Sequence, residues 1–315
     1  MQNNALLVVV LGTGGTIAGT APRAADNVGY TAARLGAAQL VAAIPALAGM
    51  PIEVEQVAQV DSKDMGFAIW RALATAVSEH LARPEVGGIV ITHGTDTLEE
   101  TAYFLQRVLA PAKPVVLVAA MRPATSLQAD GPQNLLDAMA VAREPGARGV
   151  VAVLCGTVHS ALDVRKVHTY RLDAFGSGEA GALARIEEGR VRRYREWPAG
   201  EAVGIARLPP DVEHWPKVEI VTSHAESRGA IVSAFRAAGV QGIVVAGTGN
   251  GTVHRDLACA LLDAQAAGVA VLRCTRCADG SVIDAASPAL PSADALTPVQ
   301  ARIELILQLL GRRVA

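Results

Sequence analysis

Five side chains suited to acyl-transfer chemistry stand where an apolar segment gives way to a polar loop: Thr16, Ser62, Lys63, Thr95 and Asp96. A hydroxyl attacks an acyl carbon when a neighbouring base removes its proton. The carboxyl ends of parallel strands meet at one edge of a sheet, so we expect these side chains to converge there. The set favours acyl transfer without a Ser-His-Asp triad.

Lys166 is the candidate base. It lies in segment 163–171, whose charge density is unusual in this apolar chain. A solvated loop is the alternative for these charges. A desolvated Lys166 that points back toward Thr95 would instead activate its hydroxyl. Asp96, beside Thr95, is a candidate for binding a substrate ammonium group.

The glycine-rich turn at residues 12–19 carries the other candidate nucleophile, Thr16. A dinucleotide-binding loop is excluded because Ile17 stands where its third glycine is required, and the Gly-Lys-Ser/Thr of a P-loop is absent. An ordinary tight turn remains an alternative reading. In the catalytic reading, Tyr30 relays a proton to or from Thr16, and Thr13 is a structural hydroxyl.

The backbone N–H groups of Gly15 and Thr95 are candidate donors to an oxyanion. Each such donor is worth about 3 kcal/mol of transition-state stabilisation. Residues 20–30, rich in Ala, Gly and Pro, lie between Thr16 and the next helical pattern. We expect this segment to form a mobile lid that carries Tyr30.

Apolar runs that alternate with helical patterns predict an α/β fold with two doubly wound domains. The larger, N-terminal catalytic domain (1–195) has a mostly parallel sheet. A linker rich in Trp and Pro (196–216) leads to a smaller C-terminal domain (217–315) with a parallel sheet. The predicted strands are 5–11, 52–60, 88–92, 114–120, 149–154, 218–222, 242–246 and 269–274. The predicted helices are 34–48, 66–82, 98–109, 134–142, 228–238, 255–267 and 298–310.

Composition narrows the class of protein. The chain has 315 residues, 51% hydrophobic and 3% aromatic, with a net charge of −2, which predicts neither a nucleic-acid nor a membrane partner. The first residues lack the features of a signal peptide, so we expect a cytoplasmic location and leave a periplasmic one open. Cys274 and Cys277 lack the second ligand pair of a zinc site, and no metal is expected.

Several longer motifs are similar to those of one known family. TGGTIAG (13–19) and ITHGTDTLEETAYFL (91–105) resemble the two signatures of bacterial-type L-asparaginases, and AMRP (120–123), ADGPQNL (129–135) and AGTGNGT (246–252) extend the resemblance along nearly the whole chain. The resemblance implies a two-domain α/β fold and no cofactor. It also implies hydrolysis of L-asparagine to L-aspartate and ammonia, with L-glutamine a substrate of many members.

The resemblance also implies roles for individual residues. Thr16 matches the primary nucleophile and Tyr30 the tyrosine of the lid. Thr95, Lys166 and Asp96 match a second catalytic group. The α-carboxylate and α-amino group of the substrate are held by two residues already named, Ser62 and Asp96. A homotetramer built as a dimer of dimers is implied, with each site completed by a neighbour's C-terminal domain.

Three positions depart from the family pattern. Lys63 stands where many periplasmic members carry Gln, which adds a positive charge near the substrate α-carboxylate. Thr252 replaces an Asn or Ser that reaches a neighbouring site. Segment 278–297 is shorter than its counterpart, and Asp284 is the one candidate there for the acidic residue that is donated across the dimer. No role is assigned to the pair Cys274 and Cys277.

Other functions remain open at this stage. A broad glutaminase-asparaginase differs by one methylene of substrate, which the sequence does not resolve. An amidotransferase subunit acting on a tRNA-linked acid would need a basic surface and an extra N-terminal domain, and neither is visible. A catalytically silent amino-acid-binding protein on the same fold needs neither the two hydroxyls nor Lys166.

Overall fold

The computed structural model describes residues 6–286 and 288–312. The chain divides into two compact units, Met1–Ile205 and Ala206–Ala315, and each is described by itself. Among the residues described, no helix combines the length and the apolar character needed to cross a membrane.

The first unit is built on an eight-stranded sheet in the order β10-β9-β6-β5-β4-β3-β1-β2. From β2 to β5 neighbouring strands are parallel, and from β5 to β10 they are antiparallel. The mostly parallel sheet expected from the sequence is confirmed. Its strands are β1 (Leu7–Gly14), β2 (Ile52–Val60), β3 (Val86–Thr92), β4 (Pro114–Val118), β5 (Gly149–Leu154), β6 (Thr157–Ser160), β9 (Ala184–Glu187) and β10 (Arg190–Arg193).

The strand order reverses direction at β1. The chain passes from β1 outward to β2 at the edge, then returns to the other side of β1 to form β3, β4 and β5 in turn. β1 therefore lies between β2 and β3, and the loops that leave all three strands lie at the same edge of the sheet. Ligands of open α/β sheets bind at such a switch point, beyond the carboxyl ends of the strands.

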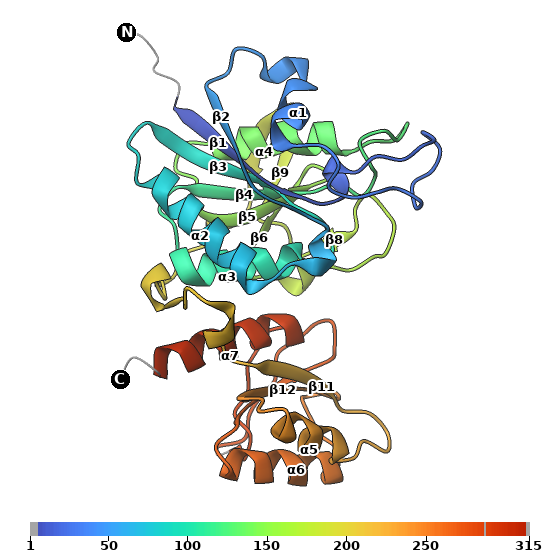
Figure 1. Ribbon diagram of the computed structural model, residues 1–315, viewed down its shortest axis with the longest axis vertical. Coiled ribbons are helices and arrows are strands. Elements are labelled where there is room, and N and C mark those ends of the chain that lie inside the picture. Colours follow the sequence, from blue (N-terminus) through green and yellow to red (C-terminus); the bar gives the residue numbers. More distant parts are fainter. Residues whose placement is uncertain (1–5, 287, 313–315) are drawn as a thin grey trace. The chain divides into compact units, whose positions relative to one another are not determined.

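Helices cover both faces of this sheet (Figure 1). Helices α1 (Ala37–Ala42) and α4 (Gly131–Ala142) lie on one face, and α2 (Phe67–Leu81) and α3 (Leu98–Leu109) on the other. The strands between them are apolar at nearly every position because both of their faces are buried. Aliphatic side chains of α4 and the central strands form one continuous core.

The structure differs from two predicted helices and contains a strand that was not predicted from the sequence. The helix expected over 34–48 ends at Ala42 and is followed by a separate 3₁₀ turn, Pro45–Leu47, because Pro45 has no N–H to continue the ladder. Helix α4 begins at Gly131 instead of residue 134, with Pro132 in its first turn. Strand β6 was not predicted. Its four residues return antiparallel to β5 through the turn at Cys155 and Gly156.

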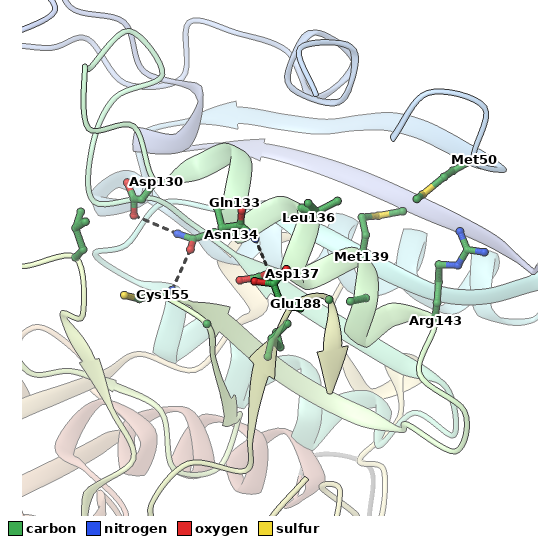
Figure 2. Close-up of a pocket in the computed structure, with 15 residues that line it drawn as sticks. Met50, Asp130, Gln133, Asn134, Leu136, Asp137, Met139, Arg143, Cys155 and Glu188 are labelled. Atoms are coloured by element: carbon green, nitrogen blue, oxygen red, sulfur yellow. Dashed lines mark hydrogen bonds between the residues drawn. The ribbon is translucent and has the colours of Figure 1, made fainter. Parts of the chain in front are cut away.

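A partly buried hydrogen-bond network holds the loop that leaves β4 (Figure 2). The Asn134 side chain donates to the Ala119 carbonyl at 2.9 Å and to Asp130 at 3.1 Å, and it accepts from the Cys155 N–H at 2.9 Å. The Asp130 carboxylate accepts the N–H groups of Met121 and Arg122 at 3.0 and 2.9 Å. Helix α4 thus fixes the backbone on which the lid docks.

The second unit contains a three-stranded parallel sheet in the order β11-β12-β13. Helix α7 packs on one face, and the paired helices α5 and α6 lie on the other (Figure 1). The predicted parallel sheet of the smaller domain is confirmed. The elements are β11 (Val218–Thr222), α5 (Ala230–Ala237), β12 (Gly242–Gly247), α6 (Arg255–Ala266), β13 (Ala270–Thr275) and α7 (Pro298–Arg312).

The loops after β1, β2 and β3 touch through glycines and one serine. A Cβ placed on Gly15 would lie 2.3 Å from the Cα and N of Gly94, and a Cβ on Gly94 would lie 2.3 Å from the Ser62 Oγ. Gly15 also has φ +81°, which L side chains rarely adopt. Glycine is required at both positions because the backbones are in direct contact.

We expect Gly15→Ala to lower the free energy of unfolding by about 3 kcal/mol or more, since it combines positive-φ strain with overpacking. Gly49→Ala is the matched control, because Gly49 has φ +78° but no atom near the added Cβ. Its cost should be about 1 kcal/mol, from strain alone. Urea unfolding followed by circular dichroism measures both values. Equal losses in the two variants would show that the Gly15–Gly94 contact tolerates a methyl group.

Candidate active site

Thr16 is positioned by the turn that ends β1. Gly14 and Gly15 both have positive φ, and Thr16 follows them as the first residue of a 3₁₀ turn, Thr16–Ala18. Its side chain is almost fully buried, and its Oγ1 lies 2.7 Å from the Tyr30 hydroxyl. The hydroxyl pair expected from the sequence is therefore formed, and Tyr30 is in place to exchange a proton with Thr16.

Segment 20–30, predicted from the sequence to form a lid, is held to its surroundings by several hydrogen bonds. Its two ends are joined by backbone hydrogen bonds between Thr20 and Thr31, at 3.0 and 2.9 Å. Its tip meets the loop after β4, where the Ser126 Oγ donates to the Asn27 side chain at 2.6 Å. The Tyr30 ring packs over Gly19, leaving no room for a Cβ there. Docking of the lid thus brings Tyr30 to Thr16.

Thr95, Asp96 and Lys166 form a second cluster after β3. The Lys166 Nζ donates to the Thr95 Oγ1 at 2.9 Å and to the Asp96 Oδ1 at 2.7 Å. Lys166 therefore does point back toward Thr95. Thr95 is buried, whereas the Asp96 side chain is 52% exposed and faces solvent beside it. One carboxylate oxygen of Asp96 holds Lys166, and the other is available to a cationic group.

The Glu99 side chain fixes the backbone of Lys166. It lies in the first turn of α3, and its Oε2 accepts the Lys166 N–H at 2.8 Å. Burial raises the pKa of Glu99 to about 6, an effect that the Lys166 N–H and the charges of Arg165 and Lys166 partly offset and that Glu100 reinforces. Glu99 thus changes charge near neutral pH beside the Lys166 cluster.

Ser62 joins the same cluster from the loop after β2. Its Oγ is buried and accepts the Asp96 N–H at 3.2 Å, so its own hydroxyl hydrogen is free to donate elsewhere. The Thr97 hydroxyl donates to the Ser62 carbonyl at 2.7 Å, which ties this loop to the one after β3.

Lys63 is paired with carboxylates close to it in the sequence. Its ammonium contacts Asp61 at 2.7 Å and Asp64 at 3.3 Å, both on its own turn, and its side chain is 62% exposed. The hydrogen bond to Asp61, with that to Asp64, raises the pKa of Lys63. The positive charge predicted to face a substrate carboxylate is therefore paired locally with two carboxylates.

The backbone donors differ from the expectation for Gly15. The Gly15 N–H donates to the Val60 carbonyl at 3.0 Å, so it is already engaged in joining the loops after β1 and β2. The prediction that this amide stabilises an oxyanion is wrong. The Thr95 N–H, by contrast, meets no acceptor within the described chain. Thr13 is structural as predicted, because its buried hydroxyl donates to the Thr92 carbonyl at 2.8 Å.

Sequence reasoning assigned no role to three residues around the site. His93 and Glu99 both lie within the second motif (91–105). In the sequence, His93 is typical of a loop, and Glu99 is typical of the first turn of a helix. Arg122 is almost fully buried under Tyr170, with its guanidinium 4.1 Å from the ring centroid, and donates to the Tyr170 carbonyl at 2.8 Å. It links the loop after β4 to the segment that carries Lys166.

The candidate residues of the second unit form hydrogen bonds and an ion pair with residues of that same unit. Thr252 pairs with Thr248 through side-chain oxygens 2.7 Å apart. Asp284 pairs with Arg273 through one oxygen and accepts from Ser292 through the other. Cys274 is buried and Cys277 exposed, and neither forms a disulfide. No group of three His, Cys, Asp or Glu side chains suited to a metal ion occurs among the described residues.

A cavity of about 990 Å³ lies elsewhere in the first unit, along α4 and the β9–β10 hairpin (Figure 2). Its lining includes Asn134, Asp137 and Glu188 and contains neither candidate threonine, Tyr30 nor Lys166. Size alone does not identify the reactive site here, because the hydroxyl chemistry is confined to the loops after β1, β2 and β3.

The chain matches known proteins along nearly its whole length. The family model "Asparaginase, N-terminal" matches residues 7–199, and "Glutaminase/Asparaginase C-terminal domain" matches residues 217–312. L-asparaginase 2 of Escherichia coli is 37% identical over 313 residues, covering 96% of this chain and 88% of that protein. The glutaminase-asparaginase of Pseudomonas fluorescens is 38% identical over 269 residues, covering 84% and 74%.

A solved structure extends the match to three dimensions. The probable cytoplasmic L-asparaginase of Campylobacter jejuni superposes with a TM-score of 0.91 at 36% identity, covering 96% of this chain and 95% of that one. The family models match both halves of the chain, and the relatives and the fold agree with them. The chain belongs to the glutaminase/asparaginase family of hydrolases.

Proposed function

We propose that this protein is an L-asparagine amidohydrolase that forms L-aspartate and ammonia through a Thr16-linked acyl-enzyme. The observation that carries the proposal is the pairing of each threonine with its own proton-transfer partner. Thr16 contacts Tyr30, and Thr95 contacts Lys166, on two loops whose backbones touch. Relatives named as asparaginases and as a glutaminase-asparaginase support the substrate class.

Substrate recognition uses the groups that the cluster leaves available. The second carboxylate oxygen of Asp96 receives the α-ammonium group, and the Ser62 hydroxyl donates to the α-carboxylate. Lys63 contributes a more distant positive charge, since two carboxylates already surround it. Gly15 has no side chain, and this leaves room for the side-chain amide of the substrate to lie against Thr16.

In the first step, the Thr16 Oγ attacks the amide carbon of the substrate. Tyr30 accepts the hydroxyl proton and passes it to the leaving nitrogen as the C–N bond breaks, so that ammonia departs. The Thr95 N–H stabilises the negative charge that develops on the carbonyl oxygen. The product of this step is an ester between Thr16 and the aspartyl group.

In the second step, water attacks that ester. The Thr95 hydroxyl orients the water and takes its proton while giving its own proton to the neutral amine of Lys166, which contacts it, and the C–O bond to Thr16 breaks. A proton returns to the Thr16 oxygen and L-aspartate leaves, so the hydroxyl groups of the enzyme are restored.

We also propose a homotetramer, a dimer of dimers, as the active assembly, with a cytoplasmic location. The similar Campylobacter jejuni protein is named as cytoplasmic. Thr252 and Asp284 are the residues of the second unit proposed to act on a neighbour's site, and Asp284 would do so from within its Arg273 pair. Sedimentation velocity tests the assembly.

Replacement of either threonine tests the roles directly. Thr16→Ala and Thr95→Ala should each lower the kcat for ammonia release from L-asparagine at least about a thousandfold with the fold retained, because a nucleophile or its partner is lost. Thr13→Ala is the control: it loses one buried hydrogen bond, about 1 kcal/mol of stability, and keeps its catalysis. Full activity in either of the first two variants would reject the assigned roles.

Protonation of Glu99 should lower kcat on the acidic side of the pH profile, which we call the acid limb. The Lys166 N–H is held best by the ionised carboxylate, so kcat should fall as pH decreases through about 6, the pKa of Glu99. In Glu99→Gln the amide oxygen accepts the same N–H at every pH, and this limb should disappear. The exposed control Glu79→Gln should keep it. An unchanged limb in Glu99→Gln would assign the titration to another group.

Substrate preference separates the proposal from its alternatives. We expect kcat/KM for L-asparagine to exceed that for L-glutamine. Because the two substrates differ by one methylene group, the difference in activation free energy should be no more than roughly 1–3 kcal/mol. Ammonia release measured with both amides and their D-forms decides this. Equal values would indicate a broad glutaminase-asparaginase. Binding by calorimetry without turnover at any pH would indicate a silent binding protein.

A further inference from the structure

The peptide group between Gly94 and Thr95 is held from one side only. Its carbonyl accepts a hydrogen bond from the His93 Nδ1 at 2.7 Å. Peptide groups are planar, and no cis bond occurs in the described chain, so the Thr95 N–H points to the opposite side. That N–H is the proposed oxyanion donor. Whatever fixes the Gly94 carbonyl therefore also aims the Thr95 N–H.

The protonation state of His93 follows from its partners. The ring is completely buried, and desolvation lowers the pKa of His93 to about 4, so it is neutral at physiological pH. The Gly94 carbonyl can only accept, so the single ring proton must lie on Nδ1. The other nitrogen, Nε2, is then an acceptor, and it lies 2.9 Å from the Thr101 Oγ1.

The buried hydrogen bond between Trp70 and Thr101 enforces this tautomer of His93. The Trp70 Nε1–H can only donate, and it donates to the Thr101 Oγ1 at 2.9 Å. The Thr101 hydroxyl is thereby oriented to donate to the His93 Nε2. The Trp70 ring is itself fixed by stacking on Phe104, with centroids 4.8 Å apart. Three hydrogen bonds thus run in one direction, from helix α2 through α3 to the Gly94 carbonyl.

We propose that His93, oriented by Thr101 and Trp70, is a positioning residue that aims and polarises the Thr95 N–H toward the oxyanion of the reaction. Hydrogen bonds in series strengthen one another, so a donor on the Gly94 carbonyl makes the N–H of the same peptide a better donor. His93 is not the base of the reaction, because both of its nitrogens are engaged away from Thr16 and Thr95.

This inference rests on the proposed function, and steady-state kinetics test it first. His93→Leu removes the donor, and kcat for L-asparagine should fall about tenfold with KM within about twofold, less than the ~100- to ~1000-fold loss when an oxyanion donor is deleted. His93→Asn restores an N–H near the position of Nδ1 and should recover most of the loss. His159→Leu is the matched control, since His159 is also buried, has a pKa lowered to about 4, and contacts Ser177 through its Nδ1.

A spectroscopic measurement on the unaltered protein is independent of turnover. Ring-¹⁵N NMR should show His93 as the neutral Nδ1–H tautomer between about pH 5 and 8. Thr101→Val should let the other tautomer appear and lower kcat by less than His93→Leu does. This variant also carries the kinetic test if His93→Leu does not fold.

Three results would overturn the inference: an Nε2–H or charged ring in the NMR spectrum, a kcat loss in His93→Leu no greater than in His159→Leu, or a rise in KM with kcat unchanged. Absence of ammonia release from the unaltered protein would instead reject the proposed function, and the NMR result would still decide the hydrogen-bond order.

Discussion

The close approach of two backbones, at Gly15 and Gly94, is the constraint on which the site depends. Parallel strands β1 and β3 deliver their loops to the same edge of the sheet, but only residues without a Cβ allow those loops to touch. Each glycine is followed directly by a threonine. Contact between the glycines therefore places Thr16 and Thr95 in one site, and each then receives a partner from a distant segment.

The polar groups of the site divide into those that are engaged and those that are left for substrate. Thr13, His93, Glu99 and the Gly15 amide all bond other parts of the protein and hold the loops in register. The hydroxyl of Ser62 and the Thr95 N–H face no protein acceptor among the described residues. Rigid support by the first set gives the second set a fixed geometry before any ligand arrives, which lowers the cost of reorganisation during reaction.

Much of this arrangement could be predicted from the sequence. Apolar runs predicted the central strands because both faces of a parallel sheet are buried. The strand-end rule placed Thr95 and Asp96 at the sheet edge, and the charged segment 163–171 supplied Lys166, which does contact both. The remaining features depend on how the loops and turns close. The Gly15 amide is taken by Val60, which is distant in sequence. Lys63 is paired by Asp61 and Asp64 of its own turn, but the sequence does not show whether its side chain meets these neighbours or a substrate. Pro45 is visible in the sequence, and its missing N–H is a reason to end the predicted helix 34–48 before it.

On the proposed mechanism, the hydrogen bond between Thr16 and Tyr30 would link substrate access to reactivity. Tyr30 lies in segment 20–30, and opening of this segment to admit a substrate would separate the proposed nucleophile from its proton acceptor. On the proposed mechanism an open molecule is chemically silent, and the threonine becomes reactive only after the lid has enclosed what entered. An asparagine residue of another protein is attached to a polypeptide chain, which a closed segment 20–30 would exclude. The proposed closure would therefore favour hydrolysis of free amino acids.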